Sequence, residues 1–256
     1  MRRPTVIALE NWNLPQKAGQ MTSKYKIIIK NLSSTTNSFY AFQAQASFAG
    51  ITTDIMSSSL AYGPLAPNAS SGAQLNFSFD TQNYVGTTSN ISPSNMEDFN
   101  ARISLVNASA TTSQASAIQP IDLTTSSPSQ VVENFSALTV SPLGLSAPTY
   151  QSGLEAGCFG VQIPPFSPST SLDLYCGCAS INQDGSVILS SFISPNPNSS
   201  IYCSPTPIYY VKSGDFPVGS VISYTIDNSA ICDFSTGNDT ISVQYNANGT
   251  FTVTPT

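Results

Sequence analysis

Charged side chains are scarce along the whole of this chain, and their scarcity limits the secondary structure that it can form. Only 9% of the 256 residues are Asp, Glu, Lys or Arg, whereas soluble domains average about 25%. The strong helix formers Glu, Lys, Arg and Met are therefore rare. Thr, Val, Ile, Tyr and Phe favour strands, and 18 Pro and 15 Gly interrupt the chain throughout. The sequence predicts an all-β protein.

Histidine does not occur anywhere in the chain. It is the commonest metal ligand and the commonest general base near neutral pH. Its absence excludes Ser-His-Asp and Cys-His hydrolases, the usual zinc sites and the facial iron triad. The sequence also lacks a phosphate-binding loop, a dinucleotide fingerprint and a nucleophile elbow. We therefore expect no cofactor and no metal, and any enzyme on this chain would be neither a His-dependent hydrolase nor a metalloenzyme.

The few charges are unevenly distributed. Six of the eight basic residues lie within the first thirty positions: Arg2, Arg3, Lys17, Lys24, Lys26 and Lys30. Beyond them, two basic residues stand against thirteen acidic ones. Nucleic-acid binding needs a basic footprint that neutralises phosphates, so we expect no nucleic-acid partner. No run approaches the ~20 apolar residues that span a bilayer, so we expect no membrane span.

Short alternating or apolar stretches recur along the chain and predict strands. They cover residues 25–32, 39–48, 74–80, 131–140, 158–163, 186–193, 207–211, 220–226, 240–245 and 250–253. Asn248-Gly249 and Asp184-Gly185 supply the positive φ that tight hairpins need. We predict an antiparallel β-sandwich of about ten to twelve short strands with long Ser/Thr-rich loops.

Three stretches depart from this strand pattern. We expect residues 1–20 to be a disordered tail, or Met21 to be the true start, and residues 21–256 to form a single β-sandwich domain. Residues 96–106 have some helical character. Residues 108–130 are poor in aromatics and rich in Ser, Thr, Ala and Gln, which predicts a long loop, or a linker that splits the domain there.

The sequence points to two different compartments. The apolar run at residues 6–9 is too short for a signal peptide, which favours the cytoplasm. Nine Asn-x-Ser/Thr sequons, typical of surface loops in secreted proteins, favour the outside. They begin at Asn31, Asn68, Asn76, Asn90, Asn107, Asn134, Asn198, Asn238 and Asn248. We therefore leave the localisation open.

All the cysteines lie in the C-terminal half of the chain: Cys158, Cys176, Cys178, Cys203 and Cys232. The one-residue spacing of Cys176-Gly-Cys178 departs from the C-x₂₋₄-C pairs of structural zinc sites. We interpret the cysteines as buried small hydrophobic residues, or as partners in one or two disulfides.

Five residues are candidates for chemistry. Tyr209 and Tyr210, followed by Asp215, form the densest mixture of aromatic and acidic groups, and Tyr and Asp can serve as acid and base. Glu155 and Asp173 are isolated carboxylates with apolar neighbours, and burial would raise the pKa of such a group. The alternative is a strand with a turn after it for the first group, and loop-exposed side chains for the two carboxylates.

Several strand patterns resemble those of a group of small, mostly uncharacterised fungal β-sandwich proteins. They are Tyr25-Lys-Ile-Ile-Ile-Lys-Asn-Leu-Ser-Ser, Phe39-Tyr-Ala-Phe, Gln74-Leu-Asn-Phe-Ser-Phe-Asp-Thr-Gln-Asn-Tyr84, Pro205-Thr-Pro-Ile-Tyr-Tyr-Val211, Gly214-Asp-Phe-Pro-Val-Gly219 and the closing Asn-Gly-Thr-Phe-Thr-Val. The resemblance covers about residues 24–253, although the segment around residues 176–203 departs from the pattern. It implies a β-sandwich of fungal origin and, because some members are associated with secondary-metabolite gene clusters, work on an apolar metabolite.

Two functional hypotheses follow. The first is a protein that handles an apolar small molecule, as a binder or as a cofactor-independent cyclase or isomerase, in which shape and exclusion of water do most of the work. The second is a non-enzymatic secreted or cell-surface interaction module. A carbohydrate-binding form of this module would need exposed Tyr to stack on sugars, since the only Trp, Trp12, lies in the expected tail.

Overall fold

The computed structural model describes residues 23–50, 53–91, 115–127, 131–167, 172–182 and 186–255. Three sequence predictions lie outside these ranges: the tail at residues 1–20, the helical stretch at 96–106 and the Asp184-Gly185 turn. Within them, nineteen strands in four sheets and one four-residue helix, α1 (Asn68–Ser71), confirm the all-β class and are compatible with a sandwich. The number of strands exceeds the predicted ten to twelve, since several strands have only two or three residues and others, such as those at residues 84–91 and 172–181, lie outside the predicted stretches.

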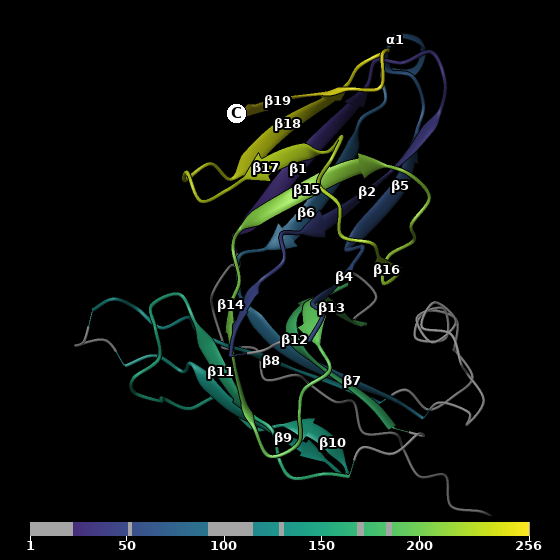
Figure 1. The fold of residues 1–256 in the computed structure, drawn as a ribbon. Helices are drawn as coiled ribbons and strands as arrows, with labels where there is room; N and C mark the ends of the chain where they lie inside the picture. Colours follow the sequence, from purple (N-terminus) through teal and green to yellow (C-terminus); the bar gives the residue numbers. More distant parts are fainter. Residues whose placement is uncertain are drawn as a thin grey trace, which may run out of the picture.

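Two four-stranded sheets form one end of the molecule (Figure 1). The order of the first is β19 (Phe251–Pro255), β18 (Thr240–Tyr245), β1 (Lys24–Asn31) and β6 (Leu75–Asp80). The order of the second is β17 (Ala230–Asp233), β15 (Ile208–Ser213), β2 (Asn37–Gln43) and β5 (Ala61–Leu65). Their facing side chains share one core, and we call this pair of sheets the first sandwich.

Alternation of apolar and polar residues explains how the first sandwich forms. On β1, Ile27 and Ile29 face the core, and on β6, Phe77 and Phe79 do the same from the neighbouring strand. Strand β2 is apolar on both faces. Phe39 points into this core, whereas Phe42 lies in a smaller cluster on the outer face. Both faces of the second sheet are therefore buried.

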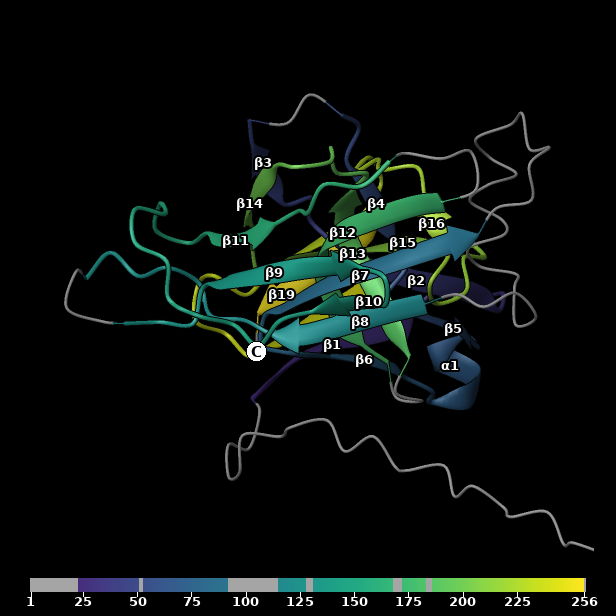
Figure 2. The same ribbon diagram turned by 90° about the horizontal axis from the view of Figure 1, so that it is seen from below.

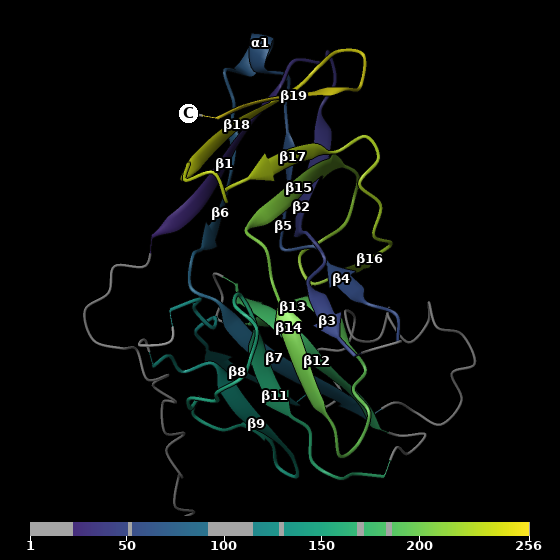
Figure 3. The same ribbon diagram turned by 60° about the vertical axis from the view of Figure 1, so that its left-hand side comes forward.

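Two larger sheets form the other end (Figures 1 and 3). The five-stranded sheet has the order β10 (Leu143–Leu145), β9 (Phe135–Val140), β11 (Phe159–Gln162), β14 (Ser200–Ser204) and β3 (Ser47–Ala49). The six-stranded sheet has the order β16 (Val221–Ile222), β4 (Met56–Ser58), β13 (Val187–Ile193), β12 (Leu172–Ile181), β7 (Tyr84–Ile91) and β8 (Ala115–Pro120). A second core lies between them, and we call this pair the second sandwich. Figure 2 views the molecule from this end, with β7 to β10 in front.

The chain passes between the two sandwiches several times. Strands β3 and β4 belong to the second sandwich, β5 and β6 return to the first, β7 to β14 form most of the second, and β15 returns again. Each core contains residues from both sides of residues 108–130. The prediction of one loop over these residues is wrong in part, since β8 pairs there with β7. Alternating Ala, Ser and Ile suffice for an edge strand of this kind.

Candidate functional site

A cavity of about 200 Å³ lies where the two sandwiches meet. We call it the junction pocket. It is lined by the connection from β6 to β7, the connection from β14 to β15, and residues of β1, β2, β12 and β15. Its polar residues are Gln43, Asp80, Thr81, Gln82, Asn83, Ser180 and Thr206, and its tyrosines are Tyr25, Tyr84 and Tyr209.

Stacked aromatic rings hold one wall of the junction pocket. The ring of Tyr209 lies parallel to that of Phe79, with centroids 4.3 Å apart and an angle of 8° between planes. Tyr25 packs against it at 6.3 Å and is itself stacked on Phe234 at 4.5 Å. Burial, followed by the neighbouring Tyr25, Cys178 and Asp80, raises the pKa of Tyr209. Its hydroxyl therefore stays protonated and able to donate a hydrogen bond across the neutral range.

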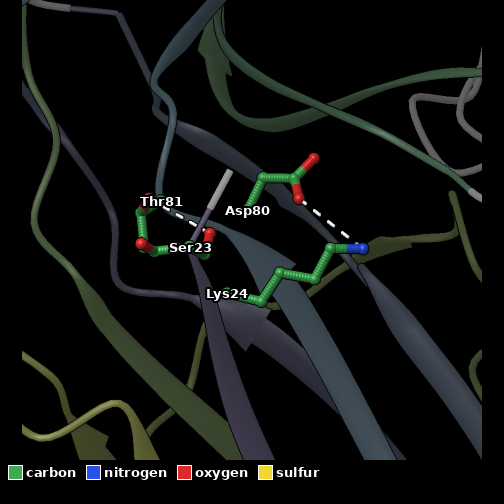
Figure 4. A network of polar contacts seen from close by, with 4 residues as sticks. All are labelled: Ser23, Lys24, Asp80 and Thr81. Carbon is green, nitrogen blue, oxygen red and sulfur yellow. Dashed lines mark hydrogen bonds and ion pairs between the residues drawn. The ribbon is translucent and has the colours of Figure 1, made fainter. Parts of the chain in front are cut away.

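Asp80 carries the negative charge of the pocket. Its carboxylate oxygen lies 3.8 Å from the Nζ of Lys24, its cross-strand neighbour at the start of β1 (Figure 4). The backbone N–H and the hydroxyl of Thr81 both donate to the Ser23 carbonyl at 3.1 Å, which fixes the end of the strand. Burial first, and then the Asp80 charge, raises the pKa of Tyr84. The same charge contributes to the raised pKa of Tyr209, and all three residues line the junction pocket.

Some polar groups of the pocket maintain its shape. The Gln43 side-chain amide donates to the Thr206 carbonyl at 2.9 Å, which ties β2 to the connection that leads into β15. The Gln82 amide donates to the Asn83 carbonyl at 2.9 Å and to the Ile121 carbonyl at 3.2 Å. The side-chain amides of both glutamines therefore already donate to backbone carbonyls and form part of the pocket wall.

Other polar groups of the pocket have no partner. Among the described residues, the hydroxyls of Tyr25, Tyr84 and Tyr209 and the side-chain amide of Asn83 make no hydrogen bond. Buried and half-buried polar groups without a partner in the protein bind water or a ligand. The arrangement can therefore offer both donors and acceptors to a small guest.

The structure does not bring the five predicted chemical residues together. Tyr209 lines the junction pocket, whereas Tyr210 points to the opposite face of β15, where burial and a hydrogen bond with Tyr224 raise its pKa. Asp215 and Glu155 are exposed in loops. Asp173 is half-buried on β12, opposite a residue of β7 in the ladder.

Sequence reasoning missed the rest of this site. Five of the missed residues form one polar run, Asp80-Thr-Gln-Asn-Tyr84, which begins at the last residue of a strand that the sequence predicts. A polar run that ends in an aromatic residue and leaves a buried strand is a detectable signal. Nothing local indicates that β1 and β15 lie beside it.

The five cysteines are buried, free thiols. Four of them, Cys158, Cys176, Cys178 and Cys203, lie in or against the core of the second sandwich, while Cys232 lies in that of the first. Burial raises the pKa of both Cys176 and Cys232 from 9.0 to about 12. In the described part of the chain, no group of three or more Cys, Asp or Glu side chains is arranged to hold a metal ion.

Among the described residues, two of the sequon asparagines are fully buried. Asn31 is fully buried, and its amide donates to the carbonyls of Thr35 at 2.7 Å and Leu65 at 2.9 Å. Asn134 is also fully buried and bonds to Thr124 and Gln151. A glycan on either amide would break these bonds. In the folded protein, these two sequons therefore serve to hold loops.

Comparison with family models, curated proteins and solved structures gives no significant match. No helix among the described residues is long and apolar enough to cross a membrane. The fungal resemblance and its metabolic association remain predictions, and the functional argument depends on the junction pocket.

Proposed function

We propose that this protein is a non-catalytic binder of a small, neutral, polyhydroxylated molecule about the size of a single sugar ring, held in the junction pocket. The observation that carries the proposal is the convergence of unpartnered hydroxyl and amide groups, from Tyr25, Asn83, Tyr84 and Tyr209, on one cavity. Sugar hydroxyls both donate and accept hydrogen bonds, so they complement such a mixed set.

The size of the cavity supports a small ligand. Its volume of about 200 Å³ lies below the ~300–1,000 Å³ of typical drug-sized sites. Its lining is also more polar than an apolar metabolite would require. We therefore retain the binder from our two hypotheses and favour a polar ligand over the apolar one that the fungal resemblance implies.

The charges in the pocket support a neutral ligand. Lys24 lies close enough to Asp80 to offset its charge. The carboxylate can then accept hydrogen bonds from ligand hydroxyls without selecting a cation. Charged acceptors of this kind form the stronger hydrogen bonds of a polar site.

The test is calorimetric titration with glucose, galactose, mannose, N-acetylglucosamine and inositol. Tyr209→Phe removes a pocket hydroxyl and is expected to weaken binding about 3–10-fold, the value of one neutral hydrogen bond. Asp80→Asn is expected to weaken it about 10–100-fold, because it removes a charged acceptor. Tyr210→Phe is the matched control, since the same hydroxyl is removed from the adjacent residue on the opposite face. Its affinity should equal that of the parent protein.

Two results would reject this function. One is that no member of the panel binds to the parent protein. The other is that a sugar binds equally well to Tyr209→Phe and Tyr210→Phe, which would place the site elsewhere. Binding of an apolar dye that sugars do not displace would return the apolar-metabolite hypothesis to first place.

A further inference from the structure

Two cysteines meet across the core of the second sandwich. Cys178 lies on β12 in the six-stranded sheet, and Cys203 lies on β14 in the five-stranded sheet. Their Sγ atoms are 3.1 Å apart. Non-bonded heavy atoms prefer about 3.5–4.0 Å, and a disulfide bond measures about 2.0 Å. A small shift of the two side chains therefore suffices for a bond.

The strand ladders hold both cysteines in place. Cys178 lies opposite Val85 of β7 on one side and Ser191 of β13 on the other. Cys203 lies opposite Phe159 of β11 and Phe48 of β3. Each residue is therefore fixed by two neighbouring strands, and the contact between the sulfurs follows from how the sheets face each other.

The other cysteines have different surroundings. The Sγ of Cys158 lies 2.7 Å from the hydroxyl of Ser204, which gives it a partner of its own. Cys232 is in the core of the first sandwich. Cys176 shares the inward face of β12 with Cys178, and among the described residues no other sulfur lies in hydrogen-bonding contact with the Sγ of Cys176.

We propose that Cys178 and Cys203 form a disulfide that links the two sheets of the second sandwich. The oxidant is a low-molecular-weight disulfide such as glutathione disulfide. The Cys178 thiolate attacks one sulfur of the oxidant and releases a first thiol. The Cys203 thiolate then attacks the protein sulfur of the mixed disulfide and releases a second thiol. Two protein thiols lose two electrons and two protons, and the oxidant disulfide gains them.

The bond forms while the chain folds. Burial, and then the neighbouring cysteines, raises the pKa of Cys203 well above its ordinary value, so the thiolate that exchange requires is rare in the closed core. Cys178 also lines the junction pocket. The crosslink would therefore hold the inner wall of that pocket, although the inference does not depend on any ligand.

The experiment is to refold the reduced, denatured protein with a mixture of glutathione and glutathione disulfide. Remaining thiols are then alkylated under denaturing conditions and counted by intact mass. We expect three alkylated thiols instead of five, and a peptic peptide pair that joins residues 178 and 203. The melting temperature should exceed that of the reduced protein by about 5–10 °C.

Variants test the assignment of the pair. Cys178→Ala and Cys203→Ala should each keep four alkylated thiols and lose the linked peptides. Cys232→Ala, from the other core, should keep the link. Five alkylated thiols in the refolded parent, or a link through Cys176 or Cys158, would overturn the proposal. Alkylated thiols can also be counted on native protein purified without reductant, which needs no refolding. The same numbers of alkylated thiols would support or overturn the proposal.

Discussion

The two sandwiches fill their cores in different ways. Among the described residues, seven of the thirteen close ring pairs lie in the core of the first sandwich. Five more lie in the cluster on the outer face of its second sheet, and the last, Tyr175 with Phe192, is in the six-stranded sheet outside the second core. The second sandwich holds the four neighbouring cysteines and most of the buried serines and threonines. One chain of uniform, uncharged composition therefore builds one core rich in ring pairs and another that consists mainly of aliphatic side chains and cysteines.

The second sandwich also contains glycines at which the backbone packs closely against neighbouring atoms. A methyl group on Gly86 would lie 2.5 Å from Ala179 Cβ, and one on Gly160 would lie 2.6 Å from a ring carbon of Phe135. At Gly177 it would overlap the Ser191 carbonyl and lie 2.7 Å from Phe192 Cα. All three glycines are in the second sandwich. The first sandwich should therefore be sensitive to the loss of volume, and the second to its gain.

The largest effect is expected for Phe39→Ala in the first sandwich. Phe39 is fully buried and makes edge contacts with the rings of Tyr245 at 5.2 Å and Phe251 at 6.4 Å. The loss should lower the free energy of unfolding by about 3–5 kcal/mol. Phe159→Ala, equally buried in the second sandwich, is the matched variant and should cost about 1 kcal/mol less, since Phe159 takes part in none of the ring pairs of the described residues. Urea denaturation measures both. A larger loss at Phe159 would contradict the contrast between the cores.

The second effect concerns added volume. Gly177→Ala in β12 should lower the free energy of unfolding by about 1–3 kcal/mol, because the new methyl group meets backbone atoms that cannot move aside. Gly63→Ala in the first sandwich is the control. There the methyl group would lie 3.0 Å from the flexible end of Leu75, and the cost should stay below about 1 kcal/mol. An equal loss of unfolding free energy for Gly177→Ala and Gly63→Ala would contradict the idea that the second sandwich is the more tightly packed.

The smallest expected effect is a loss of folding stability that appears only at high pH. It can be measured for one thiol from each core, Cys176 and Cys232. The pKa of Cys176 and of Cys232 rises from 9.0 to about 12 on folding. Between these values the unfolded chain holds fewer protons, so stability should fall as pH rises above 9, by up to ~1.4 kcal/mol per pH unit for each thiol. Below pH 9 neither thiol contributes.

Urea denaturation under reducing conditions at pH 8, 9 and 10 measures this slope. Cys176→Ala and Cys232→Ala should each give a shallower decline than the parent, whatever their stability at pH 8. A slope that neither variant changes would show that the two thiols ionise equally in the folded and unfolded states.

Local pattern was enough for a large part of the fold. Alternation in β1, β6 and β18 predicted strands whose ends agree with the structure within one residue. The Asn248-Gly249 turn joins β18 to β19 as expected, with φ of 83° at the glycine. Strand β12, which carries Cys176 and Cys178, was missed because it mixes Gly, Cys and Ala and shows little alternation. Strand β8 does alternate, but its Ala and Ser side chains are small and it contains no aromatic residue, so its sequence resembles that of a loop.

The candidate site was only partly predictable. The aromatic and acidic residues near Tyr209 in the sequence make it a candidate, yet these residues lie away from the junction pocket: Tyr210 is on the opposite face of the strand and Asp215 is exposed. Its partners in space are Phe79 and Asp80, about 130 residues earlier in the chain. Adjacent residues of a strand face opposite sides of the sheet. Tyr209 and Tyr210 therefore lie on different faces of β15, although they are neighbours in the sequence.

The sequence by itself determined the all-β class, the uncharged polar faces and the loss of histidine chemistry, because these depend on composition and on alternation within a few residues. Tertiary structure alone decided that β1 pairs in parallel with β18, that two cores form from interleaved segments, that Cys178 meets Cys203, and that a polar pocket lies between the sandwiches. Each of these features joins segments distant in the chain. Their pairing is set by which faces can be buried together, and local propensity does not contain that information.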